Sequence, residues 1–356
     1  MNRNAYKHIV LLSTLLLTAC SEQVEIASSS DAIRFAVAMS TPTTRGGVTV
    51  QNTGFDHGEE IAVFIKENAT TIGKTYDQPI IYKATTARDS EKDGMVYYAL
   101  GDPRNTGGTA KSITETSWPP SNHIDINAFY PKTAVDALNT AKTFTVQTNQ
   151  STDANYRLSD LMAAELTNVE RQDERVQLTF THLLSKVIVT LKGDRSLNIN
   201  HAGWRDDAAE SDVTAAQIES NQRLIGAKVE LMGMNNQVTI TSPRTISGIT
   251  GSQDITLGTI AATTERVVAD DETSAWQISC IVPYQTVSSA RKLIRVTMAD
   301  GGVLWYTGTA SLAQSTVNTF NITVHAKELT LTGSTIDPWT VGDTDQGHEA
   351  QPVITL

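Results

Sequence analysis

The chain contains, at residues 293–307, the stretch Leu-Ile-Arg-Val-Thr-Met-Ala-Asp-Gly-Gly-Val-Leu-Trp-Tyr-Thr. Its two outer parts, Leu293–Met298 and Val303–Thr307, are rich in β-branched and aromatic residues, which are enriched in strands. The residues between them include Asp300-Gly301, a dipeptide typical of tight hairpin turns. The stretch therefore predicts a β-hairpin, and the same pattern recurs along the chain.

Short apolar runs, separated by turns containing Gly, Pro or Asn, extend from residue 32 to residue 332. The chain has 356 residues with 22 Gly and 10 Pro, and it shows no heptads and no fixed repeat. Strands at this spacing favour an all-β fold built from sandwiches. The length suits two domains, and charged residues cluster at 171–175. We therefore expect an N-terminal β-sandwich domain at 31–175 and a C-terminal one at 176–356. The other strand candidates are residues 32–38, 60–66, 79–84, 94–100, 123–130, 144–146, 176–180, 187–191, 227–232, 237–241, 254–259, 276–282, 319–325 and 328–332.

Two segments depart from this pattern. Leu158–Ala164 fits either a turn of helix or a buried strand, and the residues alone leave both open. Ala202–Asn221 is polar, acidic and rich in alanine, which indicates an insertion with a short helix rather than part of a core.

The N-terminus has the features of a secretory signal. Arg3 and Lys7 precede the apolar run Ile9–Leu17, which is too short to span a bilayer as a stable helix. Leu17-Thr-Ala-Cys20 resembles a bacterial lipobox, in which the cysteine is acylated and becomes the new N-terminus. We expect residues 1–19 to be a lipoprotein signal peptide, Cys20 to carry the lipid, and residues 20–30 to be a solvated tether. The alternative is an ordinary signal peptide with an incidental cysteine.

Charge and cysteine content narrow the possible partners. Without residues 1–19 the chain has 26 basic and 39 acidic residues, a formal charge of −13. Such an acidic chain is not expected to bind nucleic acid or anionic lipid. If Cys20 is lipidated, Cys280 has no partner for an intramolecular disulfide. Cys280 lies in an apolar run, so we expect a buried, unreactive thiol.

The sequence offers no motif for catalysis, a cofactor or a metal. It has no nucleophile elbow, no P-loop and no dinucleotide fingerprint. His123 and Asp125 share one face of a strand but lack a third ligand. Asp343-Thr-Asp-Gln-Gly347 is similar to the start of a calcium loop but lacks its final Glu. We therefore expect no enzyme activity, no cofactor and no metal site. His182 and Lys186 share one side of a strand and are either structural polar residues at the domain junction or ligand contacts.

Several short motifs, taken in order, resemble the fimbrillin-like lipoproteins, the subunits of the type V pilus of Gram-negative anaerobes. The resemblance covers nearly the whole chain. The motifs are the lipobox at Cys20, the strand Ile33–Val37 followed by Thr44-Arg45, Ile126-Asn-Ala-Phe-Tyr-Pro131, Tyr156-Arg-Leu-Ser-Asp-Leu-Met162, Phe180-Thr-His182 with Lys186-Val187, Ile281-Val-Pro283 and Trp339-Thr340.

The resemblance implies two tandem transthyretin-like β-sandwich domains and assembly by donor-strand exchange. An external Arg-specific protease would cut between Arg45 and Gly46. The strand carrying Ile33, Phe35 and Val37 would leave, and a segment of a neighbouring subunit would replace it. The donor would come from about 340–356, with Val353, Ile354 and Leu356 as its apolar side chains. The partners would be other fimbrillin subunits, in a homo- or heteropolymer on the outer membrane, and the function would be cell adhesion.

Other interpretations of the same residues stay open. Arg45 could be a loop residue that no protease cuts, and the tail could be an ordinary last strand of its own domain. The chain could also be a monomeric surface lipoprotein that binds glycan through exposed loop aromatics such as Trp118 or Trp204.

Overall fold

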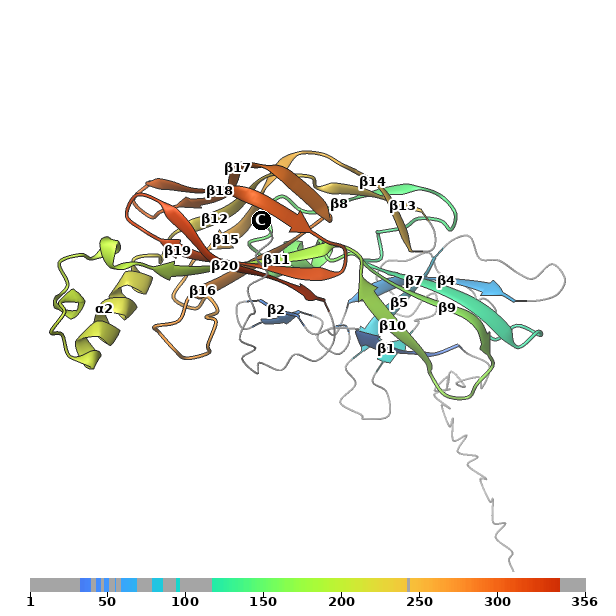
Figure 1. The fold of residues 1–356 in the computed structure, drawn as a ribbon. Helices are drawn as coiled ribbons and strands as arrows, with labels where there is room; N and C mark the ends of the chain where they lie inside the picture. Colours follow the sequence, from blue (N-terminus) through green and yellow to red (C-terminus); the bar gives the residue numbers. More distant parts are fainter. Residues whose placement is uncertain are drawn as a thin grey trace, which may run out of the picture.

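A barrel of seven strands forms one end of the molecule (Figure 1). The computed structural model describes residues 33–39, 43–45, 48–50, 55, 59–68, 79–85, 94–96, 117–241 and 244–339. Around the barrel the strands follow the order β1-β10-β9-β7-β4-β5-β6, and β1 pairs with both β10 and β6. The barrel strands are β1 (Phe35–Met39), β4 (Glu60–Glu67), β5 (Ile80–Thr85), β6 (Gly94–Val96), β7 (His123–Tyr130), β9 (Met162–Glu170) and β10 (Val176–His182).

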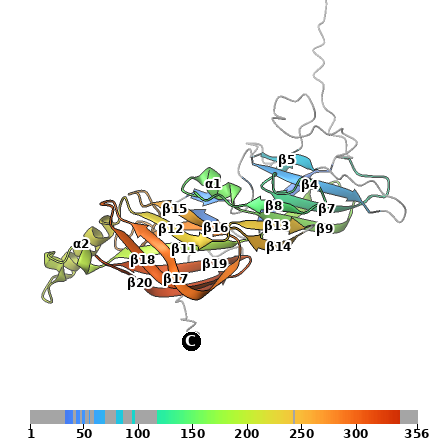
Figure 2. The same cartoon turned by 90° about the horizontal axis from the view of Figure 1, so that it is seen from above.

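Two four-stranded sheets form the second module, which lies beside the barrel (Figure 2). One sheet has the order β16-β11-β19-β20 and the other β15-β12-β17-β18. The strands are β11 (Ser185–Gly193), β12 (Lys228–Met234), β15 (Gln253–Thr259), β16 (Trp276–Val282), β17 (Gln285–Thr297), β18 (Val303–Leu312), β19 (Thr316–Val324) and β20 (Leu329–Pro338). The central strand β11 pairs with β16 and, in parallel, with β19, and its side chains are buried on both faces. A strand covered on both faces needs a nearly continuous apolar run, as Val187–Leu191 provides.

A small third sheet joins the two modules. Its order is β14-β13-β8, from β8 (Lys142–Thr145), β13 (Gln237–Thr241) and β14 (Thr245–Thr250). The outward side chains Phe64 and Phe129 of the barrel belong to the same apolar cluster as Phe144 of β8 and the core of the second module. Because β4 packs against the barrel interior with one face and against this cluster with the other, residues 61–65 are all buried.

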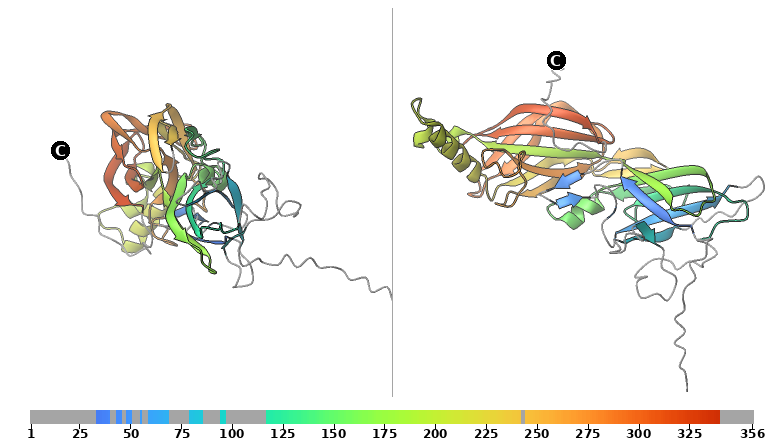
Figure 3. Two further views of the ribbon diagram at one scale, coloured as in Figure 1. Left: turned by 90° about the vertical axis from the view of Figure 1, so that its right-hand side faces the viewer. Right: turned by 90° about the horizontal axis from the view of Figure 1, so that it is seen from below.

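Helices are few and lie at the margins of the sheets. Helix α1 (Asp153–Leu158) precedes β9, and Thr152 caps it by accepting a hydrogen bond from the backbone N–H of Asn155. The insertion after β11 carries the short 3₁₀ helices η2 (Arg195–Leu197) and η3 (Ala202–Trp204) and helix α2 (Glu210–Gln222), which lies at the end of the molecule farthest from the barrel (Figure 3). In the described part of the chain, no helix has the length and apolar character needed to span a bilayer.

The all-β class expected from the sequence is confirmed, as is the hairpin at 293–307. Strands β17 and β18 pair from Thr297 opposite Val303, and Gly301 has a φ of +88°, a backbone conformation that favours glycine. The predicted helical insertion is present as α2. The segment Leu158–Ala164, which fits either a helix or a strand by sequence, contains the end of one and the start of the other. Helix α1 ends at Leu158, and strand β9 begins at Met162.

Two details differ from the sequence-based expectation. The N-terminal strands close into a barrel, whereas we expected a stacked pair of sheets. We also expected β10 to open the second domain, but it pairs with β1 and β9 and belongs to the barrel. The chain passes between the modules at the buried residues Leu183 and Leu184 instead. The charged residues at 171–175 lie in the turn between β9 and β10, which explains why they resemble a boundary.

Candidate functional site

Strand β1 is held unevenly by its two neighbours. On one side five consecutive residues pair in parallel with β10, from Phe35 opposite Val176 to Met39 opposite Phe180. On the other side, within the described residues, only Phe35 pairs, with Met95 of β6. Among the residues that the structure describes, the pairs that hold β1 are therefore mainly those with β10.

The side chains of the β1 segment fill the barrel core. Ile33 is 3% exposed and Phe35 fully buried, and the Phe35 ring meets the Tyr82 ring edge to face at 4.8 Å between centroids. Val37 is half-buried and packs on the same cluster. If β1 left, β10 would expose a row of unpaired backbone groups beside an apolar groove, which is a template for another strand.

Arg45 is the last residue of a short strand. Strand β2 (Thr43–Arg45) pairs antiparallel with β3 (Val48–Val50), and Arg45 lies opposite Val48. Only two residues separate them in the sequence. Gly46, one of these, lies outside the described residues, as do Cys20 and the three apolar residues expected in the donor, Val353, Ile354 and Leu356.

A buried polar cluster marks the point where the chain leaves the barrel. The Nδ1 atom of His182 lies 2.7 Å from Oδ1 of Asp160, and both side chains are buried. The Trp339 ring stacks on the His182 ring, with 3.6 Å between centroids and 6° between planes. The backbone N–H of Trp339 donates to the carbonyl of Ser315 at 2.8 Å. This cluster fixes the chain just after β20 to the end of β10.

Lys186 lies close to the same cluster on β11. Burial lowers the pKa of its ammonium from 10.5 to about 8, while the carboxylates of Glu265 and Asp160 act in the opposite direction. The expectation that His182 and Lys186 share one side of a single strand is wrong, because His182 ends β10 and Lys186 lies in β11. Both are buried at the junction of the modules. Their position agrees with a structural role there.

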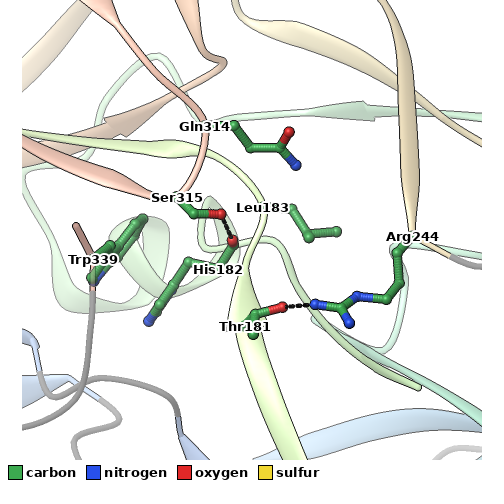
Figure 4. Close-up of a pocket in the computed structure, with 7 residues that line it drawn as sticks. All are labelled: Thr181, His182, Leu183, Arg244, Gln314, Ser315 and Trp339. Carbon is green, nitrogen blue, oxygen red and sulfur yellow. Dashed lines mark hydrogen bonds between the residues drawn. The ribbon is translucent and has the colours of Figure 1, made fainter. Parts of the chain in front are cut away.

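An open pocket of about 370 Å³ lies beside the cluster (Figure 4). Its walls include Thr181, His182, Arg244, Gln314 and Trp339. The Arg244 guanidinium donates a hydrogen bond to the hydroxyl of Thr181, which in turn donates to the carbonyl of Ala163 at 3.4 Å. Within the described chain, no carboxylate pairs with Arg244.

The cluster does not have the geometry of a hydrolase triad. Such a triad needs a serine hydroxyl directed at the histidine ring. Here the Ser315 hydroxyl donates instead to the backbone carbonyl of His182, and His182 Nε2 has no hydrogen-bond partner among the described residues. The His182–Asp160 pair therefore orients the ring on which Trp339 stacks.

The other candidates from the sequence have local structural partners. No group of three potential metal ligands occurs among the described residues, and Asp125 accepts a hydrogen bond from the backbone N–H of Asn168 at 2.8 Å. Cys280 is buried and forms no disulfide among the described residues. Asp343 and Asp345 lie outside the described residues.

The aromatic residues suggested as glycan contacts are not exposed platforms. Trp118 is 7% exposed and packs in the barrel core, so the expectation of an exposed side chain is wrong there. Trp204 is half-buried, and its indole N–H donates to the side-chain oxygen of Asn198 at 2.9 Å. Of the two residues, Trp118 is therefore excluded as an exposed glycan contact, and Trp204 offers only part of its surface.

A family model described as fimbrillin-like matches residues 44–339. The chain belongs to the fimbrillin-like family. The match runs from the end of β2 to Trp339, so it includes the second module of this fimbrillin-like chain and every barrel strand except β1. No curated protein matches the chain.

Solved structures share the fold of this fimbrillin-like chain at low sequence identity. A putative cell adhesion protein from Bacteroides uniformis is similar with a TM-score of 0.55 and 16% identity, over 88% of this chain and 99% of that one. A putative cell adhesion protein from Bacteroides ovatus gives a TM-score of 0.57 and 16% identity over the same shares. At this identity the likeness concerns the fold alone.

Sequence reasoning missed two residues of the site. Asp160 lay in a quoted motif without a role, and Arg244 was not singled out. The residues next to them in the sequence do not indicate these contacts, because Asp160 is 22 residues from His182 and Arg244 is 63 residues from Thr181. Only the fold brings them together.

Proposed function

We propose that this fimbrillin-like chain is a fimbrial subunit or accessory protein that joins other subunits by strand exchange and acts in adhesion without catalysis. Cys20 carries a lipid that delivers the chain to the outer membrane, where it is exposed on the cell surface. An Arg-specific protease cuts after Arg45, the segment with β1 leaves, and a donor segment from about 340–356 of a neighbouring subunit takes its place. The polymer contains this chain alone or several kinds of subunit.

The observation that supports this proposal best is the position of β1. It contributes buried side chains to the barrel core, and in the described part of the chain it pairs over five residues with β10 but only at Phe35 with β6. A strand of this kind caps an apolar groove that another extended segment can fill. Family membership and the similarity to two putative cell adhesion proteins agree with the proposed role.

Limited digestion of the mature protein with an Arg-specific protease tests the proposal. We expect mass spectrometry to find the fragment 20–45 released and the remaining chain starting at Gly46, followed by a ladder of oligomers. Arg45→Ala should leave the chain intact and monomeric. If Arg45→Ala forms the same oligomers as the wild type, the processing step is wrong; if the cleaved wild type stays monomeric, the assembly step is wrong.

A further inference from the structure

The pocket at the end of the β1 site carries the Arg244 cation, which has no acidic partner among the residues that the structure describes. Thr181 is the residue of β10 that follows Phe180, the partner of the last β1 residue, Met39. The Arg244 guanidinium donates one hydrogen bond to the Thr181 hydroxyl. An arginine offers five N–H donors in a fixed fork that suits a carboxylate. The site thus has the chemistry to bind an acidic side chain that arrives beside Thr181.

The faces of β10 determine which side chains of an added strand would reach Arg244. Val176, Leu178 and Phe180 are buried in the barrel, whereas Gln177 and Thr179 are exposed and Thr181 is half-buried. Directly opposed residues in an antiparallel pair lie on the same face, with Cβ atoms about 4.5–5.5 Å apart. A residue opposite Thr181 therefore points to the face where the Arg244 side chain lies.

From this geometry we infer that Arg244 forms an ion pair with Glu349 of a second copy, whose C-terminal segment enters the β1 site antiparallel to β10. The inference rests on the strand exchange proposed above. Ile354 and Leu356 alternate as Phe35 and Ile33 do, so an antiparallel segment can place Ile354 opposite Val176. Counting back along that segment places Glu349 opposite Thr181. A parallel segment with Ile354 at the same place puts Glu349 opposite residue 171, before the start of β10 and away from Arg244.

Charge complementarity supports this occupant. The segment 340–356 contains three acidic residues, Asp343, Asp345 and Glu349, and no lysine or arginine. Antiparallel ladders are also slightly more stable per residue than parallel ones. Arg244 thereby fixes the register of the donor, which matters because a slip of one residue turns Ile354 and Leu356 away from the barrel core.

Peptide binding to the cleaved full chain tests the register. A fluorescent peptide with the sequence of residues 340–356 is added to protein cut after Arg45, and the Kd is measured by anisotropy. We expect Arg244→Gln in the protein, or Glu349→Gln in the peptide, to weaken binding about three- to five-fold, as for a partly exposed ion pair. Combining the two changes should add little to either alone, which marks a direct interaction.

Two matched controls isolate the ion pair. Arg291 is exposed and, like Arg244, donates to a neutral oxygen, the carbonyl of Gly233, so Arg291→Gln should leave the Kd unchanged. Asp345→Asn in the peptide removes the same charge at a position outside the ladder and should have less effect than Glu349→Gln. The inferred register is wrong if Asp345→Asn and Glu349→Gln weaken binding equally, or if the effects of Arg244→Gln and Glu349→Gln are additive. In either case, tight binding of the wild-type peptide would still support strand exchange. Absence of any peptide binding would remove the proposed exchange and this inference together.

Discussion

Replacing Phe35 by alanine should loosen β1 selectively. The Phe35 side chain is fully buried and contacts the Tyr82 ring. Truncating a buried phenylalanine costs about 3–5 kcal/mol, through lost burial and the cavity left behind. Since every 1.4 kcal/mol is a factor of ten, the cleaved segment should bind its site roughly two to three and a half orders of magnitude less tightly.

The assay separates β1 release from general loss of stability. The mature chain is cut after Arg45, and the release of fragment 20–45 is followed by size-exclusion chromatography and mass spectrometry. Phe320→Ala is the matched control, because Phe320 is a buried phenylalanine of β19 in the second module. Both variants should lower the free energy of unfolding, but only Phe35→Ala should speed fragment release and oligomer growth. Release at the wild-type rate in Phe35→Ala would refute the view that β1 is the strand that leaves.

The remaining predictions concern the termini and the junction. Cys20→Ser should abolish incorporation of labelled fatty acid in cells; continued labelling would place the lipid elsewhere. Trp339→Ala should lower the free energy of unfolding by about 3–5 kcal/mol in urea titrations, because the indole is 4% exposed and stacks on His182; a change below 1 kcal/mol would show that the stack does not hold the junction. The pKa of Lys186 is lower in the folded chain than in the unfolded chain, so the unfolded chain binds more protons between about pH 8 and 10.5. The contribution of Lys186 to the free energy of unfolding should therefore increase as pH rises through that window. Lys186→Met should remove that increase in urea titrations at pH 7.5 and 9.5, whereas Lys192→Met, an exposed lysine of the same strand, should retain it; an unchanged pH dependence in Lys186→Met would contradict the assigned cause.

Local patterns predicted the strands well. Alternation in Val176–Phe180 and the Asp300-Gly301 turn each depend on neighbouring residues only, so the sequence contains the needed information. The same holds for the buried state of Cys280, which follows from its apolar run. The helical insertion at 202–221 was visible because alanine and acidic residues replace β-branched ones there.

Pairing between distant strands was not accessible in the same way. Strand β10 meets β1 across about 140 residues, and nothing in Val176–Phe180 distinguishes a barrel strand from the first strand of a second domain. The apolar run at 61–65 indicated burial on both faces but not what covers each face. The contact of Arg244 with Thr181 depends on the sheet that joins the modules, which includes β8 from the first half of the chain.

Disulfide trapping between two copies of the chain tests whether another copy can occupy the β1 site. One copy carries Val176→Cys, at the β10 position opposite Phe35, and a second copy carries Ile354→Cys, both in a Cys280→Ser background. We expect an intermolecular disulfide that forms only after cleavage at Arg45. No disulfide after cleavage, or the same yield before and after it, would contradict strand exchange at the β1 site.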